Sequence, residues 1–266
     1  MTLRDFIEQF LIFIKKQAYS ALFGGLMLFF IILTTYLEFP GIYRYDLLFI
    51  IALIVQVILI VTKLEQPREV LAIIIFHIFA MVMEIYKTSP AVGSWTYPEP
   101  AILAIATVPL FSGFMYSSVG SYIARSWRIN NFIFKDLPSR TILSCMAVLI
   151  YVNFFTNHFV YDVRYIIFAL LLVIFWKTKF YVTLTNREYQ IHPLITNALL
   201  ALFIWLAEQI STFARVWVYP NQMESWAPVS FHMLTSWYLL LIFSFIIIAL
   251  LQAKGGEGIN TKNPQP

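Results

Sequence analysis

Two glutamates inside apolar stretches are the side chains of this sequence best suited to do chemistry. Glu84 ends one apolar run and is followed by Trp95-Thr-Tyr-Pro, and Glu208 lies near the end of another and is followed by Trp217-Val-Tyr-Pro. A carboxyl group withdrawn from water can exchange a proton with a bound ligand, so the two glutamates are predicted to act as general acid and base. The aromatic residues that follow them are predicted to bind the ligand: Trp95, Tyr97, Trp217 and Tyr219.

Further polar groups lie at helical spacing from the two glutamates. His77 lies seven residues before Glu84, and Arg215 lies seven residues after Glu208. Residues seven apart share one face of a helix. An ionisable side chain inside a spanning helix costs about 2.5–3.5 kcal/mol on insertion scales, so it normally faces the bundle interior. We expect His77 to assist catalysis, and Arg215 and His232 to bind the ligand.

The same residues also have a structural interpretation. Glu84 would pair with Lys87 or Arg215, and Glu208 with Arg215, if these charges only hold helices together. A single histidine such as His77 is more often a hydrogen-bonded packing residue than a base. The sequence has no His-x-x-x-His pair or similar ligand spacing, so neither a metal site nor a cofactor is expected.

The composition requires an environment other than water. Of the 266 residues, 60% are hydrophobic and 12% are charged, whereas a soluble domain has about 25% charged residues. Most of the surface must therefore face lipid. The net charge of +4 comes without a Lys/Arg-rich run, so no nucleic acid partner is expected. Cys145 is the single cysteine, which excludes an intrachain disulfide.

Eight apolar runs are long enough, or nearly so, to cross a bilayer and position these residues. About 20 mostly apolar residues span the hydrocarbon core. The second and sixth runs are short, and either could instead be re-entrant or interfacial. The first run is interpreted as an uncleaved signal-anchor helix. The runs cover residues 17–37, 46–62, 68–86, 100–124, 140–158, 163–177, 193–213 and 231–252.

The distribution of basic residues predicts the orientation of these runs. With the N-terminus in the cytoplasm, fourteen of the eighteen lysines and arginines fall in cytoplasmic segments. We therefore predict an all-α, polytopic integral membrane helix bundle with about eight transmembrane helices and both termini cytoplasmic. Residues 1–253 would form a single transmembrane domain, and the polar residues 254–266 a disordered cytoplasmic tail.

The recurrence of glutamate and Trp-x-Tyr-Pro suggests an internal duplication. If the chain is a 4+4 tandem repeat, residues 17–124 correspond to 140–252, and both glutamates lie near one central axis. Chance is the alternative, because aromatic residues are abundant. In the fourth run, Pro109 is predicted to kink the helix. A stripe of small residues there predicts close helix packing, within one chain or in a homo-oligomer: Gly113, Ser117, Gly120, Ser121 and Ala124.

One stretch also resembles a known family. The segments Trp95-Thr-Tyr-Pro-Glu99, Val108-Pro-Leu-Phe-Ser-Gly-Phe-Met-Tyr116 and Val119-Gly-Ser-Tyr-Ile-Ala-Arg125 resemble the YoaT-type family of uncharacterised bacterial multi-pass membrane proteins. The resemblance is strongest over residues 84–128 and implies a protein of the bacterial cytoplasmic membrane. That family has no established activity, so no site residue follows from it. A fainter similarity, to membrane carotenoid hydratases and cyclases, covers too little to argue homology.

Three functions are compatible with these patterns. The first is a membrane-embedded enzyme or binder of a hydrophobic, isoprenoid-like or lipid-like molecule, in a polar pocket that faces outward. The second is a transporter of a small solute. The third is a structural or sensory membrane component whose polar side chains only join helices. The sequence leaves the choice between enzyme and non-enzyme open.

Overall fold

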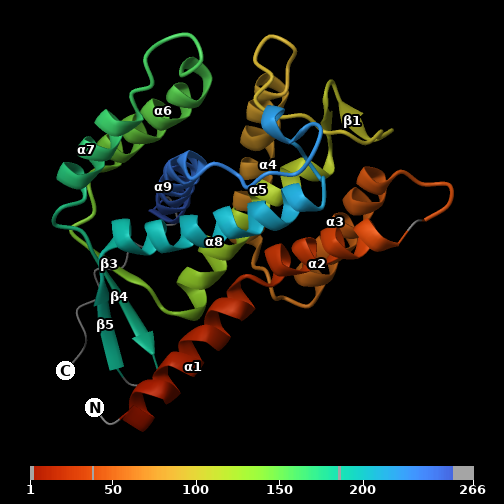
Figure 1. Cartoon of the computed structure of the whole chain (residues 1–266). Helices are drawn as coiled ribbons and strands as arrows, with labels where there is room; N and C mark the ends of the chain where they lie inside the picture. The colour runs from red at the N-terminus through yellow and green to blue at the C-terminus, as the bar shows by residue number, and fades with distance from the viewer. Residues whose placement is uncertain (1–2, 38, 185–186, 254–266) are drawn as a thin grey trace.

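The computed structural model describes residues 3–37, 39–184 and 187–253, and within them the chain is mostly helical (Figure 1). The predicted all-α class is confirmed. The predicted tail, residues 254–266, lies outside the described part. The helices are α1 (Leu3–Ser20), α2 (Leu22–Tyr36), α3 (Arg44–Val61), α4 (Pro67–Lys87), α5 (Phe111–Ile129), α6 (Arg140–Thr156), α7 (Arg164–Ile174), α8 (Pro193–Phe213) and α9 (His232–Ala253).

Short strands occur in two of the connections. β1 (Ala104–Ile105) and β2 (Val108–Pro109) form an antiparallel hairpin before α5. β3 (Ile133–Lys135), β4 (Lys179–Leu184) and β5 (Arg187–Ile191) form an antiparallel sheet in the order β3-β4-β5. The hairpin and the sheet lie at opposite ends of the molecule (Figure 1).

The last helix forms the centre of the core. α9 packs against α8, α6 and α5, and its middle is buried on every side. A helix that is apolar all round is suited to such a position. The outer faces of α3, α4 and α8 expose large apolar side chains instead, such as Ile58, Ile78 and Phe203. This distribution suits a bundle whose outside meets lipid rather than water.

Four of the described helices are long and apolar enough to cross a membrane. They comprise α3, residues 69–87 of α4, α8, and residues 232–251 of α9. The count becomes five if α1 and α2, which are bent by 69° at Ala21, form one broken span. α6 and α7 are apolar but shorter. The eight predicted crossings therefore stay a prediction. The first run, residues 17–37, contains the end of α1, the bend at Ala21 and α2, so it is not one straight helix.

The prediction that Pro109 kinks a helix is wrong. Residues 100–110 are apolar, but they form the β1–β2 hairpin, and the helix begins only at Phe111. Asp46 of α3 accepts hydrogen bonds from the backbone N–H groups of Ile102, at 2.9 Å, and Leu103, at 2.8 Å. These bonds hold the start of the hairpin against α3. Pro109 lies at the end of β2, where a missing N–H group is tolerated.

The stripe of small residues on α5 packs closely inside this chain. An added Cβ atom at Gly113 would lie 2.4 Å from Cε1 of His77, and one at Gly120 would lie 2.4 Å from Cδ2 of Phe76. His77 and Phe76 belong to α4, so the absence of a side chain on α5 lets the two helices approach. The predicted close-packing face therefore lies between α4 and α5.

We expect Gly120→Ala to destabilise the protein relative to Gly25→Ala by about 1–3 kcal/mol. The new methyl group at position 120 collides with the buried Phe76 ring, whereas an added Cβ at Gly25 meets no atom within 4 Å. Both substitutions gain about 1 kcal/mol of helix propensity, so that term cancels in the comparison. Denaturant unfolding in detergent micelles measures the difference. Equal stability of the two variants would contradict tight packing at Gly120.

Candidate functional site

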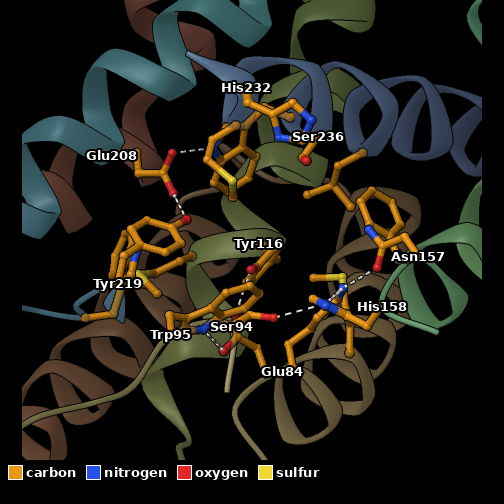
Figure 2. A pocket seen from close by; sticks show the side chains of 18 of the residues that line it. Glu84, Ser94, Trp95, Tyr116, Asn157, His158, Glu208, Tyr219, His232 and Ser236 are labelled. Atoms are coloured by element: carbon orange, nitrogen blue, oxygen red, sulfur yellow. Dashed lines mark hydrogen bonds between the residues drawn. The ribbon is translucent and has the colours of Figure 1, made fainter. Parts of the chain in front are cut away.

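A cavity of about 320 Å³ lies at one end of the bundle (Figure 2). Its walls come from the last turns of α4, α6 and α8 and the first turns of α5, α7 and α9. The two loops with the Trp-x-Tyr-Pro sequences complete it. Segments from both halves of the chain therefore meet around one space.

Glu84 lies in the wall of the cavity and is surrounded by hydrogen-bond donors. Its side chain is 1% exposed. One carboxylate oxygen accepts hydrogen bonds from Nε1 of Trp95 at 2.9 Å and from the hydroxyl of Tyr97 at 2.8 Å. The other accepts from the hydroxyl of Tyr116 at 2.6 Å. Three neutral donors on one carboxylate stabilise its ionised form and fix its position.

Glu208 is held in the same way from the second half of the chain. Its side chain is 3% exposed. Its two oxygens accept hydrogen bonds from the hydroxyl of Tyr219 at 2.6 Å and from Nε1 of Trp237 at 2.7 Å. In each half, therefore, the tyrosine of the Trp-x-Tyr-Pro sequence donates to the glutamate that precedes it. Figure 2 shows Tyr219 and Glu208 of the second half.

The two loops that carry these tyrosines are joined to each other. Thr96 and Val218 form an antiparallel bridge in which each backbone N–H donates to the other carbonyl at 2.9 Å. The rings of Trp95 and Tyr219 meet edge to face, with centroids 6.2 Å apart. The equivalent positions of the two motifs thus face one another. A 4+4 duplication of the whole chain stays a prediction.

The loop tyrosines keep their protons in this setting. Burial, and then the nearby Glu84 carboxylate, raise the pKa of Tyr97 well above its ordinary value. Burial and the Glu208 carboxylate do the same to the pKa of Tyr219. Both hydroxyls therefore act as hydrogen-bond donors to the glutamates over the physiological pH range.

Another part of the cavity wall is basic. Nζ of Lys87 lies 3.0 Å from Oδ1 of Asn157 and 2.8 Å from Nε2 of His158. Burial and the charge of Lys87 lower the pKa of His158, which favours a neutral imidazole that can accept a hydrogen bond from the ammonium group. Among the described residues, no group of three or more His, Cys, Asp or Glu side chains is placed to hold a metal ion.

Arg164 is the second cation of this wall, and its side chain comes from the start of α7. Its Nε forms an ion pair with Asp162. Its Nη1 donates to Oγ1 of Thr235 at 2.7 Å and lies 3.3 Å from Nδ1 of His232. Arg164 thus joins α7 to the first turn of α9 while facing the cavity.

Most of the predicted site residues meet at the cavity, but His77 and Arg215 do not. The ring of His77 packs against Phe114, with centroids 4.9 Å apart, because Gly113 leaves room for it between α4 and α5. Arg215 has a positive φ of 53°, which turns its side chain outward, where it donates to the carbonyl of Met223. The predicted residues that line the cavity are Glu84, Trp95, Tyr97, Glu208, Trp217, Tyr219 and His232.

The proposed structural ion pairs are also absent. Within the described part of the chain, neither Glu84 nor Glu208 has a lysine or arginine nitrogen within 4.0 Å. Lys87 turns toward Asn157 and His158 instead. The interpretation of the glutamates as partners of Lys87 and Arg215 is therefore wrong.

Three important side chains of the cavity were not singled out from the sequence: Tyr116, Arg164 and Trp237. Tyr116 lies three residues after Gly113 on α5, at the edge of the stripe of small residues. Trp237 directly follows Ser236, near the polar side chains at the start of α9. Arg164 resembles an ordinary cation at a membrane surface. The sequence therefore carries a signal for Tyr116 and Trp237, but none for Arg164.

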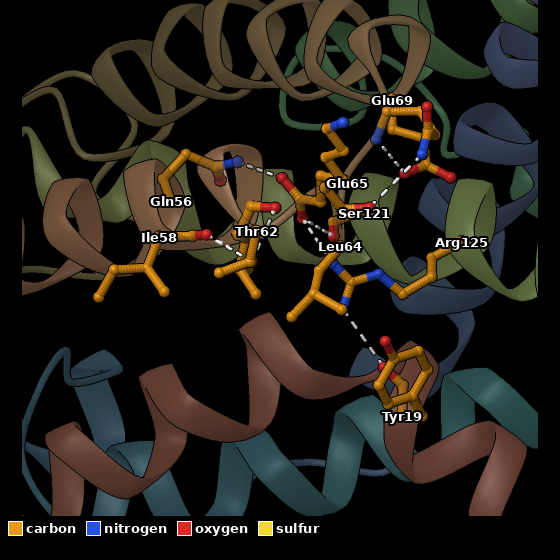
Figure 3. A network of polar contacts seen from close by, with 12 residues as sticks. Tyr19, Gln56, Ile58, Thr62, Leu64, Glu65, Glu69, Ser121 and Arg125 are labelled. Atoms are coloured by element: carbon orange, nitrogen blue, oxygen red, sulfur yellow. Dashed lines mark hydrogen bonds and ion pairs between the residues drawn. The ribbon is translucent and has the colours of Figure 1, made fainter.

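A second buried polar cluster lies outside the cavity, between α3, α5 and the residues before α4 (Figure 3). Nη2 of Arg125 lies 3.4 Å from Oε1 of Glu65, and both side chains are fully buried. Glu65 also accepts hydrogen bonds from Gln56 and from Ser121. Arg125 donates to the carbonyl of Tyr19 at 3.3 Å, which attaches α1 to α5. This cluster joins four segments of the chain.

Comparisons with known proteins agree with the resemblance found in the sequence. The model of a family described as "Protein of unknown function (DUF817)" matches residues 9–245. The "Uncharacterized protein YoaT" of Bacillus subtilis (strain 168) is 37% identical over 246 residues, which cover 92% of each chain. No solved structure matches significantly. The similarity to the YoaT-type family is confirmed, and neither description states an activity.

Proposed function

We propose that this chain, which belongs to the DUF817 family of proteins of unknown function, is a multi-pass protein of the bacterial cytoplasmic membrane. The apolar helices long enough to cross a bilayer support this proposal. The distribution of lysine and arginine supports cytoplasmic termini and about eight crossings, with α6 and α7 as shorter segments. In that orientation the cavity opens toward the outer face.

Within this protein, the cavity binds or transforms a hydrophobic or lipid-like molecule. The observation that carries the proposal is the meeting of two buried carboxylates and two buried cations in one aromatic-walled space. Apolar pockets with a few convergent polar groups are typical ligand sites. Glu84 and Glu208 would exchange protons with the ligand in an enzyme and would orient it in a binder. Trp95, Trp217 and Tyr219 would cover its apolar part.

A small-solute transporter is the second candidate. The broken pair α1–α2, bent by 69°, favours it, because transporters commonly use discontinuous helices. Uptake or counterflow in proteoliposomes would support this alternative. A purely structural role is the third candidate, because Glu84 joins α4 to Tyr116 of α5 and Glu208 joins α8 to Trp237 of α9.

Mass spectrometry of the protein purified in mild detergent tests the proposed function. We expect a lipid-like molecule to copurify with the wild type and to be lost from the double variant Glu84→Gln, Glu208→Gln, because both changes remove charge from the cavity wall. Glu99→Gln is the matched control: Glu99 pairs with Arg44 outside the cavity. An unchanged set of bound molecules in a folded double variant would overturn the proposal.

A further inference from the structure

We propose that the cavity recognises a zwitterionic group, with an ammonium beside the two glutamates and a phosphate or carboxylate beside Lys87 and Arg164. This inference rests on the proposed function, because it assigns a ligand class to the same cavity. It follows from the groups that contact each charged side chain, and from the absence of an ion pair between the two glutamates and Lys87 or Arg164.

The acidic wall is suited to an organic cation. All five hydrogen bonds to the carboxylates of Glu84 and Glu208 come from neutral indole and phenol groups, and no lysine or arginine nitrogen of the described residues lies within 4.0 Å of them. The same indoles and phenols line the cavity, where their ring faces attract a cation. An ammonium group, methylated or not, gains from both the carboxylate charge and the aromatic faces.

The basic wall is suited to an anion. Lys87 is only 5% exposed, and in the described part of the chain it has no carboxylate oxygen within 4.0 Å. Its contacts, Asn157 and His158, carry no negative charge. Arg164 uses Nε for its ion pair with Asp162 and Nη1 for Thr235 and Ser236, and its Nη2 makes no hydrogen bond to another described residue, so that nitrogen is left to donate to a ligand. Phosphate or carboxylate oxygens satisfy such donors.

The two walls do not neutralise each other, although they are close. Glu84 and Lys87 are three residues apart on α4, which corresponds to a rise of about 4.5 Å. Each is nevertheless held by its own set of neutral partners, and the two form no ion pair. A ligand whose opposite charges are separated by a few bonds bridges this gap. A purely anionic group would meet the two glutamates as like charges.

Two sources supply this chemistry: the head group of a zwitterionic lipid, and a free zwitterion of the same structure. Wild-type protein in detergent can be titrated with dihexanoyl phosphatidylethanolamine, with dihexanoyl phosphatidylglycerol and with free phosphoethanolamine. A change in tryptophan fluorescence and native mass spectrometry report binding, since Trp95, Trp217 and Trp237 line the cavity.

We expect the zwitterionic lipid to bind at least about tenfold more tightly than the anionic one. Lys87→Met should weaken both lipids, whereas Glu208→Gln should weaken the zwitterionic lipid and strengthen the anionic one. The wild-type comparison needs no variant, so it holds even if a substitution prevents folding. Glu99→Gln should change neither affinity.

The outcomes separate this inference from the proposed function. Tight binding of free phosphoethanolamine without binding of its lipid supports the zwitterion and overturns the lipid-like ligand. Equal binding of both lipids supports a lipid site and overturns the zwitterion. A preference for the anionic lipid, or no binding of any of the three, also overturns the zwitterion.

Discussion

Replacement of Glu65 by alanine is expected to lower the free energy of unfolding by about 3–5 kcal/mol. Glu65 is the ion-pair partner of Arg125, and both side chains are fully buried. Removal of the carboxylate leaves a guanidinium in the interior, where Nε and Nη2 already lack hydrogen-bond partners. A buried charge without its partner bears the cost of lost hydration with no compensating attraction.

Two control variants distinguish the effect of an unpaired buried charge from the effect of lost packing. The double variant Glu65→Leu, Arg125→Met removes both charges together and should recover the part of the loss that comes from the unpaired charge, whereas the donors of Gln56 and Ser121 stay without their acceptor. Arg128→Met breaks an ion pair with Glu69 in which the arginine side chain is 41% exposed and the glutamate side chain 7%, and should cost less than Glu65→Ala, whose ion pair is fully buried on both sides. Denaturation in detergent micelles measures all three. A loss below that of Arg128→Met would show that Glu65 and Arg125 are not coupled.

Asp46→Ala is expected to cost about 2–4 kcal/mol, because it removes two charge-assisted hydrogen bonds to backbone N–H groups. The Asp46 side chain is buried and reaches across from α3 to Ile102 and Leu103. Without it, the start of the β1–β2 hairpin loses its attachment. Since this hairpin leads into α5, the change should also disturb Tyr116 and thus the donors around Glu84.

Asp46→Asn is the matched variant for this prediction. The amide keeps one oxygen acceptor and nearly the same shape, so it should retain part of the stability that alanine loses. Unfolding free energies, with protease cleavage between residues 100 and 110, measure the two effects. If alanine and asparagine destabilise equally by less than about 0.5 kcal/mol, the hairpin is held by other contacts.

The sequence predicted the helices better than their boundaries. Hydropathy located α3, α4, α8 and α9, because each is a long apolar run bordered by polar residues. Hydropathy did not distinguish the apolar residues 101–110, which contain the β1–β2 hairpin, from a helix, because apolar side chains occur in both. The decisive groups were Asp46, which binds the hairpin backbone, and Pro109, which lies in a strand. These contacts are non-local and invisible to hydropathy.

The residues of the candidate site that belong to a repeated motif could be predicted from the sequence. Those whose placement depends on the rotation of a helix about its axis could not. Glu84 and Glu208, with their Trp-x-Tyr-Pro loops, were found because charge inside an apolar run is conspicuous. His77 shares the face of Glu84 by spacing, yet the close approach of Gly113 places its ring between helices. Arg164 seemed a surface cation until the fold placed α7 beside the first turn of α9. Such placements depend on tertiary packing.

The bridge between Thr96 and Val218 joins the backbones of the two loops that carry the Trp-x-Tyr-Pro sequences. Each glutamate is held by donors from a loop whose backbone is tied to the other loop. A displacement beside Glu84 is therefore transmitted to Glu208 although the two carboxylates belong to different halves of the chain. Substitution of one glutamate is therefore expected to shift the position of the other, while the cavity itself remains.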